Sequence, residues 1–183
     1  TKQTLTDSSD QPQSVFAIDL DNDGDIDIVT CYYGDDTIAW WENNGSESFT
    51  ENTISTSING VTSIFAVDVD SDGDIDILSA AFDSNKFSWW ENNGSESFTE
   101  RVITSTSSGA SKIYPVDIDN DGDIDIVTGS YSGDTVSWWE NDGSENFTEH
   151  VISNAINGVT SIHPFDINGD GNIDVVTSSG IDD

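Results

Sequence analysis

Positive charge is the scarcest property of this 183-residue chain. It has 4 Lys and Arg residues against 36 Asp and Glu residues, and its formal net charge is -32. Because nucleic acids and anionic membranes are bound through clustered Lys and Arg, we predict no nucleic-acid partner. We also predict no insertion into a membrane, since no apolar run approaches the roughly 18 residues of a spanning helix.

Cysteine and proline are scarce as well. Cys31 is the single cysteine, which excludes a disulfide framework within the chain. Two of the 3 prolines, Pro115 and Pro164, fall within short apolar segments. Proline is tolerated in the edge strand of a sheet, so we predict that both segments are edge strands. The chain begins at Thr1, and we expect a mature segment or a piece of a longer protein.

The most prominent feature of the sequence is an acidic nonapeptide at residues 19–27, Asp-Leu-Asp-Asn-Asp-Gly-Asp-Ile-Asp. It returns at 68–76 and 117–125, and in weaker form at 166–174, so the spacing is 49 residues each time. Four copies of one acidic loop at a fixed period predict a repeat architecture.

The loop has the donors that a hard cation needs. Carboxylates at positions 1, 3 and 5 converge, the glycine at position 6 permits a positive φ, and position 7 offers its backbone carbonyl. The aspartate at position 9 closes the cage. The EF-hand is excluded, because it needs Glu at position 12 and flanking helices, whereas Thr or Ser stands there and the flanks are β-branched. We therefore predict one Ca²⁺ for each of the four loops.

The predicted metal-binding residues are the loop positions with side-chain oxygens: Asp19, Asp21, Asp23, Asp25, Asp27, Asp68, Asp70, Asp72, Asp74, Asp76, Asp117, Asp119, Asp121, Asp123, Asp125, Asp166, Asn168, Asp170, Asn172 and Asp174. In the fourth loop Asn168 replaces an aspartate and Asn172 stands at position 7, so we expect a weaker site there. The four loops hold half of the acidic residues of the chain. Without cations they repel one another, so folding should depend on the metal.

Each period predicts four strands. In the second period they are 63–67, 75–82, 87–91 and 98–104, and the metal loop joins the first two. Four antiparallel strands in about 49 residues are typical of a β-propeller blade. The second strand of the first period is apolar on both faces, with Ile26 and Ile28 on one and Val29 and Cys31 on the other. Such a strand belongs to a sheet stacked between two others.

The fold class that we predict is an all-β propeller of four-stranded blades, partial or completed by oligomerisation. The chain is then one propeller region, 1–183. Residues 1–11 form the outer strand of a split blade, 12–59, 60–108 and 109–157 form whole blades, and 158–183 form the first two strands of the split blade. An open blade edge invites self-association.

The Asp-x-Asp-x-Asp-Gly-x-x-Asp loops resemble the FG-GAP or VCBS repeats of integrin α-subunit-like propellers. The resemblance covers essentially the whole chain. It implies a seven-bladed calcium-bearing ring, found mostly in secreted adhesion or recognition proteins, and therefore an extracellular or cell-surface location.

Three Trp-Trp pairs occur in the third strands. Adjacent strand residues point to opposite faces, and Trp40, Trp89 and Trp138 share a face with Ile38, Phe87 and Val136, so we predict that they are core. The other three, Trp41, Trp90 and Trp139, are expected to be partly open. They are either core between blades or a platform for sugar rings, and both interpretations stay open here.

The sequence favours a non-enzymatic, calcium-stabilised module that recognises a glycan or a protein. No cluster of unique acid, base or cationic residues breaks the repeat, and neither His150 nor His163 has a repeated partner. The alternatives are the propeller part of a secreted polysaccharide lyase or hydrolase, and a spacer without a ligand. The turns between the second and third strands vary most, and we expect a ligand to be read there.

Overall fold

The computed structural model describes residues 4–5, 9–46 and 48–180, and every regular element within them is a β-strand. Blade 1 consists of β1 (Pro12–Ile18), β2 (Asp27–Tyr32), β3 (Thr37–Asn43) and β4 (Phe49–Ser55). Blade 2 consists of β5 (Val61–Val67), β6 (Asp76–Ala81), β7 (Lys86–Asn92) and β8 (Phe98–Thr104). Blade 3 consists of β9 (Ala110–Val116), β10 (Asp125–Ser130), β11 (Thr135–Asn141) and β12 (Phe147–Ser153). The last pair is β13 (Val159–Phe165) and β14 (Asp174–Ser179).

Each blade is an antiparallel meander in which sequence neighbours pair. The all-β propeller class and the four-stranded blade are therefore confirmed. The outer strand predicted over 1–11 falls in part on 1–3 and 6–8, which lie outside the described residues, and Thr4, Leu5 and 9–11 belong to no strand. None of the described residues belongs to a helix long and apolar enough to cross a membrane.

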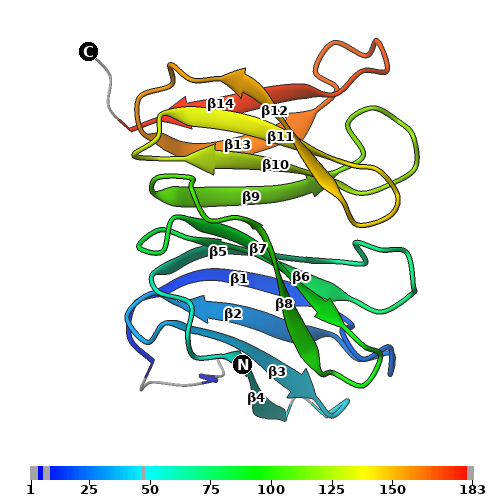
Figure 1. Cartoon of the computed structure of the whole chain (residues 1–183). Helices are drawn as coiled ribbons and strands as arrows, with labels where there is room; N and C mark the ends of the chain where they lie inside the picture. Colours follow the sequence, from blue (N-terminus) through cyan, green and yellow to red (C-terminus); the bar gives the residue numbers. More distant parts are fainter. Residues whose placement is uncertain (1–3, 6–8, 47, 181–183) are drawn as a thin grey trace.

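The blades radiate from a series of inner strands, β1, β5, β9 and β13, each of which contacts the next (Figure 1). Their side chains form a column of rings. Phe16 and Phe65 have centroids 4.4 Å apart, Phe65 and Tyr114 5.0 Å, and Tyr114 and His163 5.4 Å. Pro115 and Pro164 lie in β9 and β13, which are edge strands as predicted.

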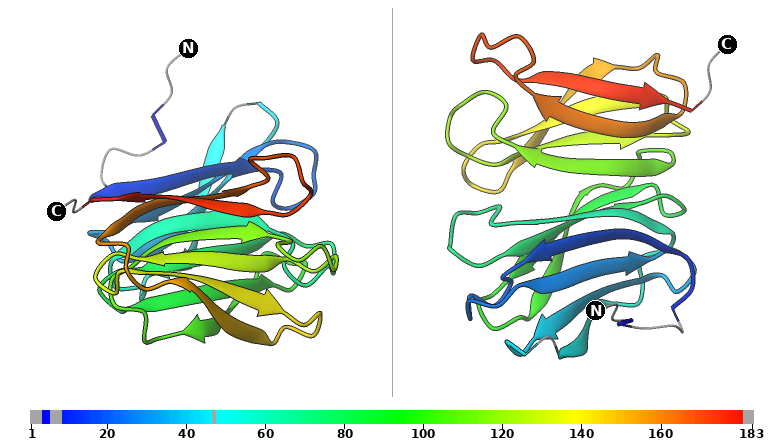
Figure 2. Two further views of the ribbon diagram at one scale, coloured as in Figure 1. Left: turned by 90° about the horizontal axis from the view of Figure 1, so that it is seen from above. Right: turned by 180° about the vertical axis from the view of Figure 1, so that it is seen from behind.

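The core lies between consecutive blades in three clusters. β6 is buried along its whole length because blade 2 has a neighbour on each face. The prediction for Ile26 is wrong, since its side chain is 54% exposed. Ile26 directly precedes β2 of blade 1. Blade 1 stands at one end of an open arc whose other end is β13–β14 (Figure 2), and no described blade covers its outward face.

Candidate metal sites

Three carboxylates meet in each of the first three hairpins between the inner strand and the second strand. Asp19, Asp21 and Asp27 each offer an oxygen atom, and these atoms lie within 4.8 Å of one another. The equivalent groups are Asp68, Asp70 and Asp76 in blade 2, and Asp117, Asp119 and Asp125 in blade 3. Loop positions 1, 3 and 9 therefore converge, whereas the predicted group also included position 5, and each group could hold a metal ion.

The position-9 aspartate also joins the loop to the blade. Asp76 is fully buried. Its Oδ2 accepts a hydrogen bond from the Val69 backbone N–H at 3.0 Å, and its Oδ1 accepts one from the Asn92 N–H, at the end of β7, at 2.8 Å. Asp27 and Asp125 repeat both bonds. The sequence analysis did not predict this hydrogen bond to the third strand. The asparagine that follows each Trp-Trp-Glu segment is the residue that donates it, and its recurrence could have indicated the link.

Positions 5 and 7 of the loop do not belong to the three-carboxylate groups. Asp23 Oδ1 accepts the backbone N–H of Asp25 at 2.8 Å. The Asp25 carboxylate lies against the turn between β3 and β4, where a Cβ added to Gly45 would come within 2.5 Å of it. Gly24 has a φ of 96°, as the loop requires, and its N–H donates to Asp19 Oδ2 at 3.0 Å. Metal binding by the position-5 and position-7 side chains stays a prediction.

The donor set fits a hard cation. Asp19 Oδ1 and Asp68 Oδ1 are buried and have no hydrogen-bond partner among the described residues, which is costly for a carboxylate oxygen unless a cation approaches it. Burial, followed by the charge of neighbouring carboxylates, raises the pKa of Asp70 and of Asp119. Burial also raises the pKa of Asp76 to about 7. Only oxygen ligands are present, which suits Ca²⁺.

The fourth loop is built differently. Asp166 accepts three backbone N–H groups, from Gly169 at 2.6 Å, Asp170 at 3.2 Å and Gly171 at 2.9 Å. Asp174 is only half-buried, because β14 has no third strand beside it among the described residues. The described part of this loop contains no converging group of three acidic residues. A weaker fourth site remains our prediction.

A side-chain hydrogen bond joins neighbouring loops at two of the three interfaces among the described residues. The Asn22 side-chain amide donates to the Gly73 carbonyl at 3.4 Å, and Asn120 donates to the Gly171 carbonyl at 3.4 Å. The loop of blade 2 has Ser71 at the equivalent position, which is too short to make the same bond to the next loop.

Trp41, Trp90 and Trp139 are core, which is the first of the two interpretations given for them, and they are not partly open, because their exposed fractions are 6%, 5% and 7%. Their indole N–H groups donate to Tyr32 Oη at 3.2 Å, Ser79 Oγ at 3.0 Å and Thr128 Oγ1 at 3.0 Å. Buried rings offer no face to a sugar. Trp40 and Trp89 are core, as predicted, but Trp138 is only half-buried and stacks on His150 with centroids 4.6 Å apart.

The FG-GAP-like repeat family matches residues 19–79, 68–128 and 117–177, and the chain belongs to this family. Each match begins at the first aspartate of one metal loop and extends into the following repeat. This confirms the resemblance that the loops carry. The chain has no match among curated proteins.

Solved structures with the same fold include a lectin of Agrocybe aegerita, described as recognising non-reducing terminal N-acetylglucosamine (TM-score 0.60, 21% identity, 89% of this chain and 45% of that one). Others are the Vibrio cholerae biofilm matrix protein Bap1 (0.53, 21%, 92% and 28%) and an exo-β-1,3-galactanase of Clostridium thermocellum (0.54, 13%, 91% and 41%). The chain spans less than half the length of each, and the identities support the fold alone.

Proposed function

We propose that this chain is a non-enzymatic, calcium-binding propeller module of a secreted or cell-surface protein. It acts in adhesion or in recognition of a glycan or a protein. The observation that carries the calcium assignment is that the same cluster of three aspartates recurs in the equivalent hairpin of three blades. In two of the three clusters, one buried carboxylate oxygen has no hydrogen-bond partner among the described residues.

The role that we assign to calcium is structural. Asp76 belongs to the carboxylate group and at the same time accepts hydrogen bonds from the loop and from the end of β7. A bound cation would offset the repulsion among the three carboxylates. It would therefore fix the hairpin against the third strand of its blade. Asp27 and Asp125 give blades 1 and 3 the same link.

An enzymatic role has weaker support. The galactanase neighbour shares the fold, but a propeller enzyme needs a unique cluster of reactive side chains. Each histidine has a contact of another kind: His150 Nε2 lies 2.6 Å from Glu140 Oε2, and His163 belongs to the aromatic column. Among the described residues, neither histidine lies in a cluster of reactive side chains that is unique to one repeat. This favours recognition over catalysis.

A thermal melt in excess calcium and in EDTA tests the proposal. We expect a markedly higher melting temperature with calcium, because ligand that binds only the folded state stabilises it. Asp76→Asn should remove much of this difference. Glu96→Gln, which removes one charge from an exposed turn residue, is the matched control and should keep it. A melting temperature that does not respond to calcium would overturn the metal assignment.

A further inference from the structure

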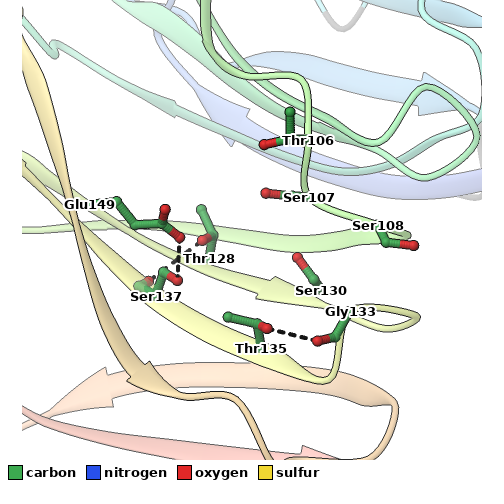
Figure 3. A pocket seen from close by; sticks show the side chains of 9 residues that line it. All are labelled: Thr106, Ser107, Ser108, Thr128, Ser130, Gly133, Thr135, Ser137 and Glu149. Carbon is green, nitrogen blue, oxygen red and sulfur yellow. Dashed lines mark hydrogen bonds between the residues drawn. The ribbon is translucent and has the colours of Figure 1, made fainter.

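A polar pocket lies between blades 2 and 3, where the repeat is broken. Its volume is about 280 Å³. One wall is the linker between the blades, Thr106–Ser108, and the other is the face of blade 3 that carries Thr128 and Ser130 on β10, Thr135 and Ser137 on β11 and Glu149 on β12 (Figure 3). The described residues that line the pocket include no aromatic side chain, and most of them carry a hydroxyl group.

The pocket exists because one linker residue differs from its counterparts. Ile58, Ser107 and Ile156 occupy the same linker position, since each backbone N–H donates to the carbonyl of the preceding blade's turn, at 3.2, 3.1 and 3.1 Å. Ile58 is 1% exposed and fills the core between blades 1 and 2, and Ile156 packs into the core between blade 3 and β13–β14. Ser107 is too short to fill the equivalent space.

A second substitution widens the same space. In blade 2 the Lys86 ammonium lies 2.5 Å from Glu100 Oε1, and Ser88 Oγ donates to that oxygen at 2.8 Å. In blade 3 the counterpart of Lys86 is Thr135, while the bond from Ser137 Oγ to Glu149 Oε1 remains at 2.8 Å. Within the part of the chain that the structure describes, Glu149 has no ion-pair partner.

Several polar groups of the pocket already have hydrogen-bond partners within the protein, and the hydroxyl of Ser130 faces the pocket itself. Thr128 Oγ1 accepts the Trp139 N–H, and Thr135 Oγ1 donates to the Gly133 carbonyl at 2.7 Å. Ser130 is only 5% exposed as a residue, but its hydroxyl oxygen is not one of the buried atoms that lack a partner, because it lines the pocket and is reached from it. Figure 3 shows this hydroxyl directed into the space beneath the linker. An accessible hydroxyl can both donate and accept a hydrogen bond, so the pocket offers Ser130 to a ligand or to water.

We propose that this pocket binds one neutral sugar ring. The inference rests on the proposed recognition function and gives it a place on the molecule. Ser and Thr hydroxyls both donate and accept, which matches the hydroxyls of a sugar. The volume lies just below the roughly 300–1,000 Å³ of pockets for drug-sized ligands, and so suits a single ring. Glu149 and the net charge of -32 disfavour anionic sugars.

Titration of the calcium-loaded chain with galactose, mannose and N-acetylglucosamine, followed by saturation-transfer NMR and calorimetry, tests this site. We expect saturable binding of at least one of them, and at least tenfold weaker binding of glucuronate. Ser107→Ile restores the residue of the other linkers. It should abolish binding without lowering the melting temperature, because it fills the pocket with a side chain that the repeat already accommodates.

Ser105→Ile makes the same change at an exposed linker residue outside the pocket, and it should leave binding intact. Sugar binding that survives Ser107→Ile would overturn the site, as would failure of all three neutral sugars. A glycan array separates this outcome from the broader proposal. Glycan binding that is equal in wild type and Ser107→Ile would keep the recognition function and reject the pocket, whereas a blank array with no free-sugar binding would reject both.

Discussion

At the scale of single residues, the buried position-9 aspartate has two tasks. Asp76 accepts one backbone hydrogen bond from the metal loop and one from the end of β7, and it shares a cation-sized space with Asp68 and Asp70. The first task favours the ionised carboxylate, but burial raises its pKa to about 7. Metal-free protein therefore keeps an ionisable group in a place that disfavours its charge.

This conflict predicts opposite pH dependences with and without metal. A group whose folded pKa is raised contributes stability at low pH that is lost as the pH rises through the folded pKa. In EDTA, stability should therefore fall between pH 3.8 and about 7. In excess calcium the trend should reverse, because deprotonation creates the ligands. Melting temperatures across this range measure both, and Asp76→Asn should flatten each curve. Parallel curves in EDTA and calcium would contradict the prediction.

At the scale of elements, the turn between the second and third strands of each blade clamps the linker to the next blade. Asn85 has a φ of 55°, its carbonyl accepts the Ser107 N–H, and its Oδ1 accepts the Gly109 N–H at 2.8 Å. Asp36 and Asp134 have φ values of 54° and 52° and make the same two bonds. These turns vary in sequence, yet this one position is fixed by geometry.

Asn85→Ala should lower the free energy of unfolding by about 1–3 kcal/mol, since it leaves the Gly109 N–H without its partner and places alanine at a positive φ. Asn85→Asp restores the residue of two other repeats and should be close to neutral. Urea unfolding in excess calcium measures both variants. Equal stability of wild type and Asn85→Ala would show that the clamp contributes nothing.

Local patterns in the sequence predicted most of the elements. The strand expected over 98–104 coincides with β8, and the one over 75–82 contains β6, because period-two patterns and turn glycines act within a few residues. The exposure of Ile26 and Trp41 was not predictable in this way. The exposure of a side chain depends on which blade or side chain covers its face of the strand. The sequence does not reveal this, because the residues on the two faces of one strand can be of similar type. The metal loops were predictable from the repeated aspartates. The pocket at Ser107 was not, because it is recognised only once the packing of the equivalent residues Ile58 and Ile156 is known.

At the scale of the whole molecule, both ends of the arc present faces that are buried elsewhere in the chain. Val15 is 67% exposed, whereas its counterparts Ile64, Ile113 and Ile162 are at most 6% exposed. At the other end Val176 is 47% exposed, and its counterparts Val29, Leu78 and Val127 are fully buried. The two exposed faces therefore correspond to the two sides of an interface between consecutive blades. The face at one end of one copy is complementary to the face at the other end of a second copy.

We predict that the chain self-associates end to end. Association should strengthen with calcium and with salt, because both reduce repulsion between copies of net charge -32. Sedimentation velocity over a range of concentrations measures it. Val176→Asp should weaken the association, and Thr56→Asp, at an exposed linker residue of blade 1, is the matched control. A monomer at every concentration in calcium and salt would contradict this prediction.

The pocket at Ser107 also has a mechanical consequence. In a stack of repeats each unit is held only by its neighbours, so the least filled interface yields first under load. The interface between blades 2 and 3 contains the pocket and has Ser71 in place of the asparagine that links the other loops. A molecule pulled from its two ends should therefore part there first, into one half with blades 1 and 2 and another with blade 3 and the β13–β14 pair. Ser107→Ile should raise that rupture force in single-molecule pulling, and an unchanged force would place the weak joint elsewhere.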